Sequence, residues 1–390
     1  MKQWNGLRAL CNIRGLFFRI YLRVFEKFIE YYNRAICSNF LQPLLILRVR
    51  QDEHSLIEPA YDITATNPLT VYAIEDGFLL PDFNCVYDYC GTQAVESAHL
   101  RSRPDEVFGN YPPTVQMKQW PNAVVFDEAV YGGIMFGRHY GHFLTDSLAR
   151  LWFLKNDSLI NSGLPILFHS QKIDSASQSV LALLDGMGIS DRIHIIESPI
   201  KVKTLHIPEQ ANIAGSWTHP EFVEFTRWIG GRILAKSTPV DNCWKGKKVY
   251  LSKVSFSKTK RNTIAYSGEK KLEHGLVERG YLSVYPEKMS ILDQILLFSS
   301  AAEIAGIMGS AFHTMLLAPS VEARKVRYFC GADWACQRPT PFLNCDKLRG
   351  LESVFIPVIY SNPLCLKRYS NRWNRHCIVD YEEGLRLLEI

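Results

Sequence analysis

The sequence predicts an α/β protein with two domains, on the basis of its composition, its alternating pattern and one break in that pattern. The chain has 390 residues, of which 47% are hydrophobic and 21% charged, a composition typical of a folded globular protein. Past residue 60, short apolar runs alternate with amphipathic stretches, the pattern of a parallel sheet covered by helices. Residues 237–247 are rich in Ser, Thr, Pro, Asp, Asn and Gly, which predicts a linker.

This linker divides the body into a first domain at residues 60–236 and a second at residues 248–378. The predicted strands, in chain order, are Ala123–Phe126, Ile166–Phe168, Ile193–Ile196, Thr204–Ile207, Lys248–Leu251, Leu282–Val284 and Glu303–Gly306. The predicted helices are His142–Phe153, Ser177–Met187, Pro220–Ala235, Lys270–Arg279, Ser290–Ala301 and Ala311–Ala318. A terminal helix is expected within residues 379–390, and it could cross back to the first domain.

Residues 1–58 are expected to form a basic N-terminal arm. The first 50 residues carry a net charge of +7, whereas the remaining 340 residues sum to −2. A helix here would have a cationic strip and a broad aromatic and aliphatic face, which suits the surface of an anionic membrane through residues 1–40. Packing of this helix against the body or against a second copy, and a disordered arm, are the alternatives. The nearly neutral body argues against a nucleic-acid binder.

Several classes of protein are disfavoured by what the sequence lacks. The longest apolar candidate, Ile304–Val321, contains Gly, His, Ser and Pro and is predicted to be buried core rather than a membrane span. The ten cysteines form no C-x-x-C pair and no signal-peptide core precedes them, which favours a cytosolic protein with reduced thiols. Motifs of P-loop enzymes, serine hydrolases and zinc proteases are absent as well, and we expect neither a metal nor another cofactor.

The first group of candidate functional residues lies in the segment GRHYGHFLTDSLARLWF, which begins at Gly137. His142 and Asp146 are i and i+4 neighbours if a helix begins near Gly141. A carboxylate beside an imidazole can orient the ring, and either group can take a proton from a hydroxyl. Arg138 and His139 are candidate acceptor contacts in the preceding loop. Alternatively, the His142–Asp146 pair only stabilises a surface helix.

The second group lies in residues 245–271, which contain nine basic residues and one acid. The strand ending at Leu251 leads directly into this basic stretch and places Lys253 at its carboxyl end, where open α/β sheets bind ligands. The pair Lys260 and Arg261 follows, and clustered cations suit a diphosphate. A solvated basic loop without a ligand, or a surface that stacks nucleic-acid bases, would also fit this composition.

The third group follows the strand Glu303–Gly306. Gly309 and Ser310 form a turn before a predicted helix, and the backbone amides of such a turn can bind an anion. His313, in the first turn of that helix, could donate to the same anion. Upstream, Glu287 in the segment YPEKMS could hold ribose hydroxyls, although its neighbour Ser290 could equally serve only to cap a helix.

The order of these motifs resembles glycosyltransferase family 61. H-F-L-x-D is followed by Y-L-S-K with a K-R pair, then by Y-P-E-K-M-S-x-x-x-Q and I-A-G-x-x-G-S-A-F-H, across about residues 120–330. This family includes bacterial capsule and exopolysaccharide proteins, plant xylan transferases and animal N-acetylglucosaminyltransferases. The resemblance implies a GT-B fold, in which two Rossmann-like domains face a cleft. It also implies inverting transfer from a nucleotide sugar, often a UDP sugar.

The resemblance also assigns roles to individual positions. His142 and Asp146 match the acceptor-side motif, one of them being the base, and the donor-side motifs match Lys253, Lys260, Arg261, Glu287, Gly309, Ser310 and His313. Three positions depart from the family: Met308 replaces a common His, Lys253 replaces Arg, and the N-E that usually follows the basic pair has only Glu269 as an approximate substitute.

The expected function is therefore sugar transfer, without a metal, to a glycan or lipid-linked glycan in surface polysaccharide biosynthesis. We expect the protein to lie in the cytoplasm at the inner face of the membrane. The alternative, which the departures favour, is a non-catalytic, membrane-associated module that binds a nucleotide or a glycan.

Overall fold

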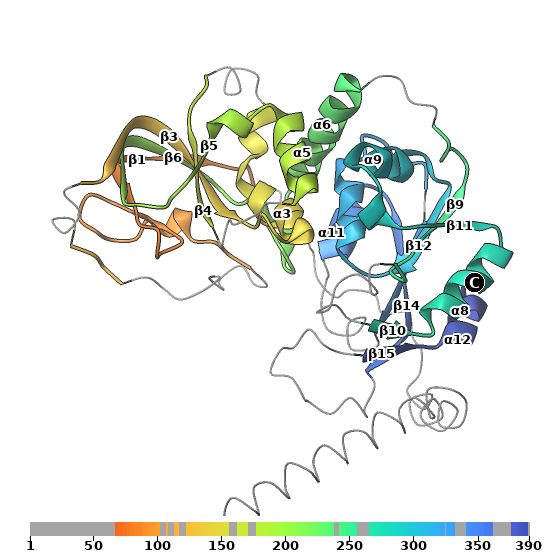
Figure 1. The fold of residues 1–390 in the computed structure, drawn as a ribbon. Helices are drawn as coiled ribbons and strands as arrows, with labels where there is room; N and C mark the ends of the chain where they lie inside the picture. The colour runs from red at the N-terminus through yellow and green to blue at the C-terminus, as the bar shows by residue number, and fades with distance from the viewer. Residues whose placement is uncertain are drawn as a thin grey trace, which may run out of the picture.

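The computed structural model of the chain describes residues 67–101, 107, 113–116, 122–155, 162–170, 177–237, 242–255, 265–323, 325–331, 341–361 and 376–388. The predicted N-terminal arm at residues 1–58 and the basic pair Lys260 and Arg261 lie outside these described residues. Two large sheets dominate the described part, and they lie next to each other with helices between and around them (Figure 1).

The first sheet has six strands in the order β2-β1-β6-β3-β4-β5. The strands are β1 (Val71–Leu79), β2 (Val86–Tyr87), β3 (Val124–Met135), β4 (Ile166–Ser170), β5 (Ile193–Ile195) and β6 (Ile200–Pro208). The pairs β6-β3, β3-β4 and β4-β5 are parallel, whereas β1 is antiparallel to both β6 and β2. The chain adds β4 and β5 on one side of β3 and then returns to add β6 on the other, so the order reverses between β3 and β6. Ligands of open α/β sheets bind outside the carboxyl ends of strands at such a reversal.

The second sheet has seven strands in the order β10-β15-β14-β13-β12-β9-β11. The strands are β9 (Lys248–Leu251), β10 (Ala265–Ser267), β11 (Tyr281–Val284), β12 (Glu303–Ile307), β13 (Lys325–Gly331), β14 (Glu352–Ser361) and β15 (His376–Val379). All adjacent pairs are parallel except β14 and β15. Since β11 lies on one side of β9 and β12 on the other, the order of this sheet reverses between β9 and β12.

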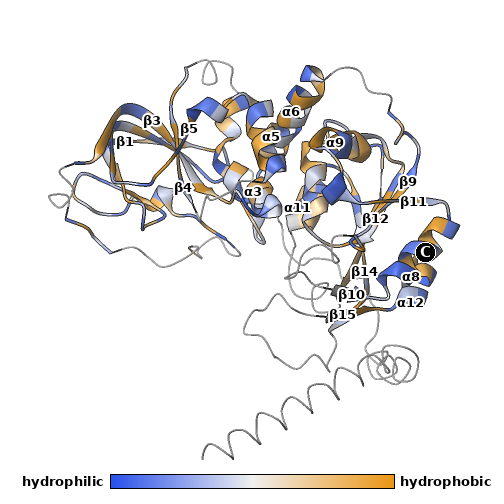
Figure 2. Cartoon of the chain, viewed as in Figure 1, coloured by the Kyte–Doolittle hydropathy of each residue, from blue (hydrophilic) through white to orange (hydrophobic). Residues whose placement is uncertain are grey.

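Helices cover the sheets because each has an apolar stripe, visible as the orange sides of α5, α6 and α8 in Figure 2. The helices of the first half are α3 (Tyr140–Thr145), α5 (Gln178–Met187) and α6 (Pro220–Lys236), with the 3₁₀ helices η1 (Val95–Ser97), η3 (Ser147–Arg150), η4 (Trp152–Lys155) and η5 (Ser190–Arg192). A short hairpin of β7 (Asn212–Ile213) and β8 (Trp217–Thr218) precedes α6. The helices of the second half are α8 (Glu269–Glu278), α9 (Ile291–Ser300), α11 (Pro341–Leu348) and α12 (Tyr381–Leu387), with η6 (Pro286–Lys288) and η7 (Ser310–Leu317).

A single apolar core joins the two halves. It contains Phe222 and Ile229 of α6 together with Ile295 of α9 and Leu317 of η7, all fully buried. The backbones approach so closely that a Cβ on Gly230 would lie 1.5 Å from the carbonyl oxygen of Leu317. Helix α6 and segment η7 therefore form a rigid, close-packed junction, since interiors at this density resist deformation.

The mixed α/β class that the sequence predicts is confirmed, and each predicted strand is present. Strand β3 continues nine residues past Phe126, to Met135. The structure also contains strands that the sequence did not predict: β1, β2, β7, β8, β10, β13, β14 and β15. The division into domains at residues 60–236 and 248–378 stays a prediction, although the two sheets fall on either side of the predicted linker.

Two predicted helices have a different form. The stretch His142–Phe153 is not one helix, because α3 ends at Thr145 and two 3₁₀ turns follow. Ser147 explains the break, since its hydroxyl donates to the carbonyl of Ile134 (2.8 Å) and accepts from the amide of Phe136 (2.9 Å), tying the chain to β3. The stretch predicted as Ala311–Ala318 is the 3₁₀ helix η7, enclosed between α6 and the core of the second sheet.

The terminal helix also differs from the expectation that it could cross back to the first domain. Helix α12 packs on α8 and β14, and Gly384 on α12 lies against Leu272 and Phe329 of the second sheet's outer core. Its place beside α8 is visible in Figure 1. The described part of this segment therefore completes the outer layer of the second sheet.

Candidate active site

The predicted residues of the first half are positioned by the carboxyl end of β3, next to the reversal in strand order. Gly132 lies against the ring of Phe168, which leaves no room for a Cβ, and Gly133 has a φ of 90° at a β-bulge. The bulge bends the end of β3, and the loop that follows leads directly into α3. Helix α3 thus begins at the carboxyl edge of the first sheet, with His142 in its middle and Asp146 immediately after it.

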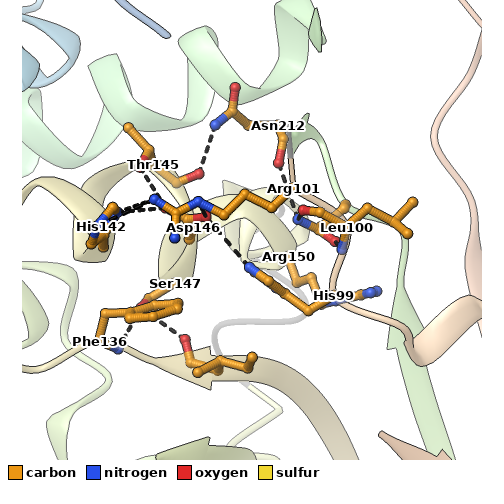
Figure 3. Close-up of polar contacts among 12 residues, drawn as sticks. His99, Leu100, Arg101, Phe136, His142, Thr145, Asp146, Ser147, Arg150 and Asn212 are labelled. Atoms are coloured by element: carbon orange, nitrogen blue, oxygen red, sulfur yellow. Dashed lines mark hydrogen bonds and ion pairs between the residues drawn. The ribbon is translucent and has the colours of Figure 1, made fainter. Parts of the chain in front are cut away.

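Asp146 is the centre of a buried polar cluster (Figure 3). Its Oδ1 lies 3.4 Å from Nε2 of His99 and 3.7 Å from Nε of Arg101. Its Oδ2 accepts from the hydroxyl of Thr145 (2.7 Å) and lies 3.3 Å from Nδ1 of His142. The side chain of Asp146 is fully buried, so all of its partners come from the protein.

These partners determine the protonation state of Asp146. Burial alone raises the pKa of a carboxyl group, but here the hydrogen bonds to His142 and His99 and the positive charge of Arg101 outweigh it. The pKa of Asp146 therefore lies well below its ordinary value, and the group is a carboxylate at neutral pH. Burial lowers the pKa of His99, although Asp146 partly opposes this, so His99 donates to the carboxylate as a neutral imidazole.

His142 is the accessible member of the cluster, because 37% of its side chain is exposed. A terminal nitrogen of Arg101 lies 3.0 Å from Nδ1 of His142 and 3.2 Å from Nε2. A guanidinium only donates, so Arg101 pairs with whichever ring nitrogen carries no proton. When Nδ1–H points to Asp146, the free lone pair is on Nε2.

The predicted residues of the second half meet at the reversal between β9 and β12. Lys253 follows β9, and its Nζ donates to the carbonyl of Met308 (2.8 Å), after β12. A Cβ on Gly309 would lie 2.3 Å from this Nζ, so only glycine permits the approach. The parallel register of β9 and β12 brings these residues together.

Glu269 supports this turn from the start of α8. Its Oε1 accepts from the backbone amide of Lys253 (2.6 Å) and lies 3.5 Å from the hydroxyl of Tyr250. Burial raises the pKa of Glu269 to about 7, although the amide of Lys253 and its charge oppose the shift. Burial likewise lowers the pKa of Lys253 to about 8, against the attraction of Glu269. Glu269, the approximate substitute for the N-E of the family motif, is thus in direct contact with Lys253.

The two sets of residues meet where α3 contacts η7. A Cβ on Gly141 would lie 2.8 Å from Cβ of Ser310 and 3.3 Å from Cδ2 of His313. The hydroxyl of Tyr140 lies 2.8 Å from Oγ1 of Thr314 in η7. His313 itself is buried and stacks on Phe342 with ring centroids 4.3 Å apart, and burial lowers its pKa to about 4. His313 is therefore neutral at physiological pH.

The remaining predicted residues lie around this centre. Arg138 and His139 are exposed in the loop before α3, and the ring of His139 lies 5.9 Å from that of His142. Glu287 is exposed in η6, at the carboxyl end of β11 and on the same edge of the sheet as Lys253. Ser310 is the first residue of η7, and Gly309 occupies the N-cap position before it.

A family model described as Glycosyltransferase 61 matches residues 140–323. The matched segment begins at α3 and continues past η7, so it contains both sets of residues that meet at this junction. Residues 140–323 are a glycosyltransferase family 61 domain. The resemblance in the order of motifs is confirmed, and the match supports glycosyltransferase activity, which in general requires a glycosyl donor and an acceptor. No curated protein matches the chain.

Sequence reasoning missed His99 and Arg101, which contact Asp146 and His142. They lie 47 and 41 residues from their respective partners Asp146 and His142, and outside the matched segment. No periodicity or motif surrounds them in the sequence. The only signal is that His99 and Arg101 are separated by a single residue in the stretch between β2 and β3.

Two further properties of the described residues bear on the site. No group of three or more His, Cys, Asp or Glu side chains among them is arranged to hold a metal ion. Within the same ranges, every helix is too short or too polar to cross a membrane.

Proposed function

We propose that the protein is an inverting glycosyltransferase that transfers a sugar from a nucleotide-sugar donor, a UDP sugar in the first instance, to a glycan or lipid-linked glycan acceptor. The observation that carries this proposal is the contact of Gly141 with Ser310, which brings the His142–Asp146 helix to the Lys253–Gly309 turn. Each group lies at the carboxyl edge of its own sheet, next to the reversal in strand order. This arrangement supports a GT-B architecture with the acceptor on the first sheet and the donor on the second.

On the donor side, the nucleotide diphosphate binds at the reversal between β9 and β12. Lys253 supplies a positive charge there, and the start of η7 supplies backbone amides at Gly309 and Ser310. Glu287, in η6 after the neighbouring strand β11, is the proposed acceptor of hydrogen bonds from ribose hydroxyls. Lys260 and Arg261, which the family resemblance assigns to the diphosphate, complete the proposed site. These cations stabilise the leaving diphosphate electrostatically, and the proposal includes no metal or other cofactor.

On the acceptor side, His142 is the base and Asp146 orients it. Asp146 has no exposed side-chain surface and a lowered pKa, so it cannot reach a substrate hydroxyl and holds a proton poorly. It accepts from Nδ1–H of His142 and leaves Nε2 to receive the proton of the acceptor hydroxyl, which displaces Arg101 from that nitrogen. Arg138 and His139 are proposed acceptor contacts.

The reaction is a direct displacement. The acceptor oxygen loses its proton to Nε2 of His142 and attacks the anomeric carbon. The bond from that carbon to the diphosphate oxygen breaks, and the nucleoside diphosphate leaves from the opposite face with the bonding electrons. Attack from the face opposite the leaving group inverts the anomeric configuration.

The cellular setting is proposed from the sequence. A basic amphipathic arm at residues 1–40 would hold the protein at the cytoplasmic face of a membrane, beside a lipid-linked acceptor in capsule or other surface polysaccharide biosynthesis. Co-sedimentation with anionic liposomes tests this part of the proposal, because it should fall when residues 1–40 are deleted. Unchanged binding of the truncated protein would contradict the membrane role.

A panel of UDP, GDP, CMP and TDP sugars tests the main proposal. One donor should raise the melting temperature of the full chain by mass action and should be consumed when an acceptor glycan is present. His142→Ala should lower transfer by about 10²- to 10⁴-fold, the range for losing a general base. Asp146→Asn should abolish transfer while nucleotide affinity stays intact. Donor binding without any turnover would instead support the competing function, a non-catalytic binding module.

A further inference from the structure

A chain of hydrogen bonds crosses the junction between the two halves of the protein. The hydroxyl of Tyr140 lies 2.8 Å from Oγ1 of Thr314, and this Oγ1 in turn donates to Oε1 of Gln294 (3.2 Å). The amide nitrogen of Gln294 then donates to the carbonyl of Pro286 (2.9 Å). Thr314 has only one hydroxyl proton, which goes to Gln294, so Tyr140 must be the donor to Thr314. Every link of the chain thus has a defined direction.

This chain joins the three segments that the proposed reaction requires. Tyr140 is the first residue of α3 and lies two positions before His142. Thr314 belongs to η7, the segment that begins at Ser310. Pro286 begins η6 and precedes Glu287. The segment with the proposed base is therefore connected to both turns on the donor side, through the side chains of Tyr140, Thr314 and Gln294.

The apolar contacts at this junction do not have the same specificity. Ile295, Leu316 and Leu317 contribute apolar packing, which favours close contact but does not depend on the direction of individual groups. A hydrogen bond loses strength steeply when its angle or distance changes. Thr314 is fully buried and Gln294 is 7% exposed, so water does not readily replace a lost partner. Arg227 and Asn344 also donate between the halves, to the carbonyls of Pro319 and Ser216 (both 3.1 Å). The chain through Thr314 differs from these bonds because it begins on α3, the helix that contains His142.

We propose that Tyr140 is a positioning residue for sugar transfer. Its hydroxyl, through Thr314, holds α3 in the orientation that places His142 at the acceptor hydroxyl next to the bound donor. This role rests on the proposed function, since it concerns the distance between the base and the donor. Tyr140 itself touches neither substrate.

The test compares Tyr140→Phe, Thr314→Val and the double variant with the wild-type chain. Each single change should lower kcat for transfer about tenfold or more, because displacement of a catalytic group by about 1 Å can cost up to 10²-fold. The Kd for the nucleotide should stay within about twofold. Because both changes break the same chain, the double variant should be no slower than the slower single variant.

A second readout separates positioning from simple loss of stability. Hydrogen exchange of the amides of residues 140–146 should slow when UDP binds the wild-type protein, and this protection should be lost in Tyr140→Phe. Tyr281→Phe is the matched control, because it removes the hydroxyl that donates to Glu303 (2.7 Å) at the amino-terminal end of the second sheet. This control should keep wild-type kcat and the same protection of residues 140–146.

The outcomes distinguish this inference from the function on which it rests. A wild-type chain that transfers no sugar overturns the proposed function and the role of Tyr140 with it. A wild-type chain that transfers sugar, together with a Tyr140→Phe variant of undiminished kcat and unchanged protection, overturns the positioning role alone. An equal fall in kcat for Tyr140→Phe and Tyr281→Phe would also overturn it, since the effect would then be one of general stability.

Discussion

A Cβ on Gly141 would lie 2.8 Å from the Cβ of Ser310, so the first turn of α3 and the first residue of η7 are in contact without a side chain between them. Real Cβ atoms are not found this close, and the backbone of Ser310 lies only 3.5 Å away as well. Glycine at this position therefore fixes the distance between the two carboxyl edges on which the proposed chemistry depends.

Gly141→Ala should force α3 and η7 apart. We expect a loss of about 1–3 kcal/mol in the free energy of unfolding, as for other overpacked sites. Transfer activity should fall at least about tenfold, because the proposed base moves relative to the donor. Urea unfolding and initial rates with saturating donor measure the two effects. Wild-type rates in this variant would contradict the proposed approach of the two edges.

Gly230 and Gly231 offer a matched pair for the junction itself. A Cβ on Gly230 would collide with the carbonyl of Leu317, whereas a Cβ on Gly231 would meet no atom within 4 Å. Gly230→Ala should destabilise the protein by about 2 kcal/mol or more. Gly231→Ala should stabilise it by about 0.5–1 kcal/mol, because alanine is the better helix former. Urea unfolding of both variants provides the comparison, and equal effects would argue against the close contact of α6 with η7.

Lys253 should govern the affinity for the donor nucleotide. Its Nζ lies at the Gly309 turn, so Lys253→Met removes the positive charge where we propose that the diphosphate binds. The Kd for UDP, measured by calorimetry, should rise about tenfold or more, in line with the loss of a charge-assisted contact. Lys248→Met is the control, because Lys248 pairs with Glu303 at the opposite end of the same strand. An equal loss of affinity in both variants would indicate a nonspecific charge effect.

Asp346 should make stability depend on pH. It accepts from Tyr328 and Ser353 (both 2.7 Å) through Oδ2, while Oδ1 has no partner among the described residues. Burial raises the pKa of Asp346 from 3.8 to about 6, against the opposing effects of these bonds and of Arg349. Between pH 4 and 6 the unfolded chain loses this proton while the folded protein retains it. Stability from this group therefore falls as the pH rises through that window and stays lower above it.

Asp346→Asn should remove that penalty. The gain in the free energy of unfolding should be on the order of 2–3 kcal/mol at pH 8 and should shrink toward pH 4, as the shift in pKa requires. Urea unfolding of the wild-type and variant proteins at pH 4.5, 6 and 8 measures the difference. A gain that is the same at all three values would show that ionisation of Asp346 is not its cause.

The local pattern of the chain was sufficient for the α/β class and for the seven strands that it predicts. Hydrophobic periodicity reports which residues are buried, and parallel strands bring their carboxyl ends to one edge whatever else the fold does. The order of motifs was likewise sufficient for the family, because it depends on residue types and spacing alone.

Only the tertiary structure decided how the site is assembled. The end of α3 at Thr145 depends on bonds from Ser147 to β3, and His99 contacts Asp146, which lies 47 residues away in the sequence. Tyr140 and Thr314 are separated by 174 residues, and nothing near either one indicates the other. Such partners are selected by the packing of whole elements, since a buried polar group needs a partner at hydrogen-bonding distance wherever the chain supplies one. The sequence around each of these residues therefore does not predict its hydrogen-bond partner.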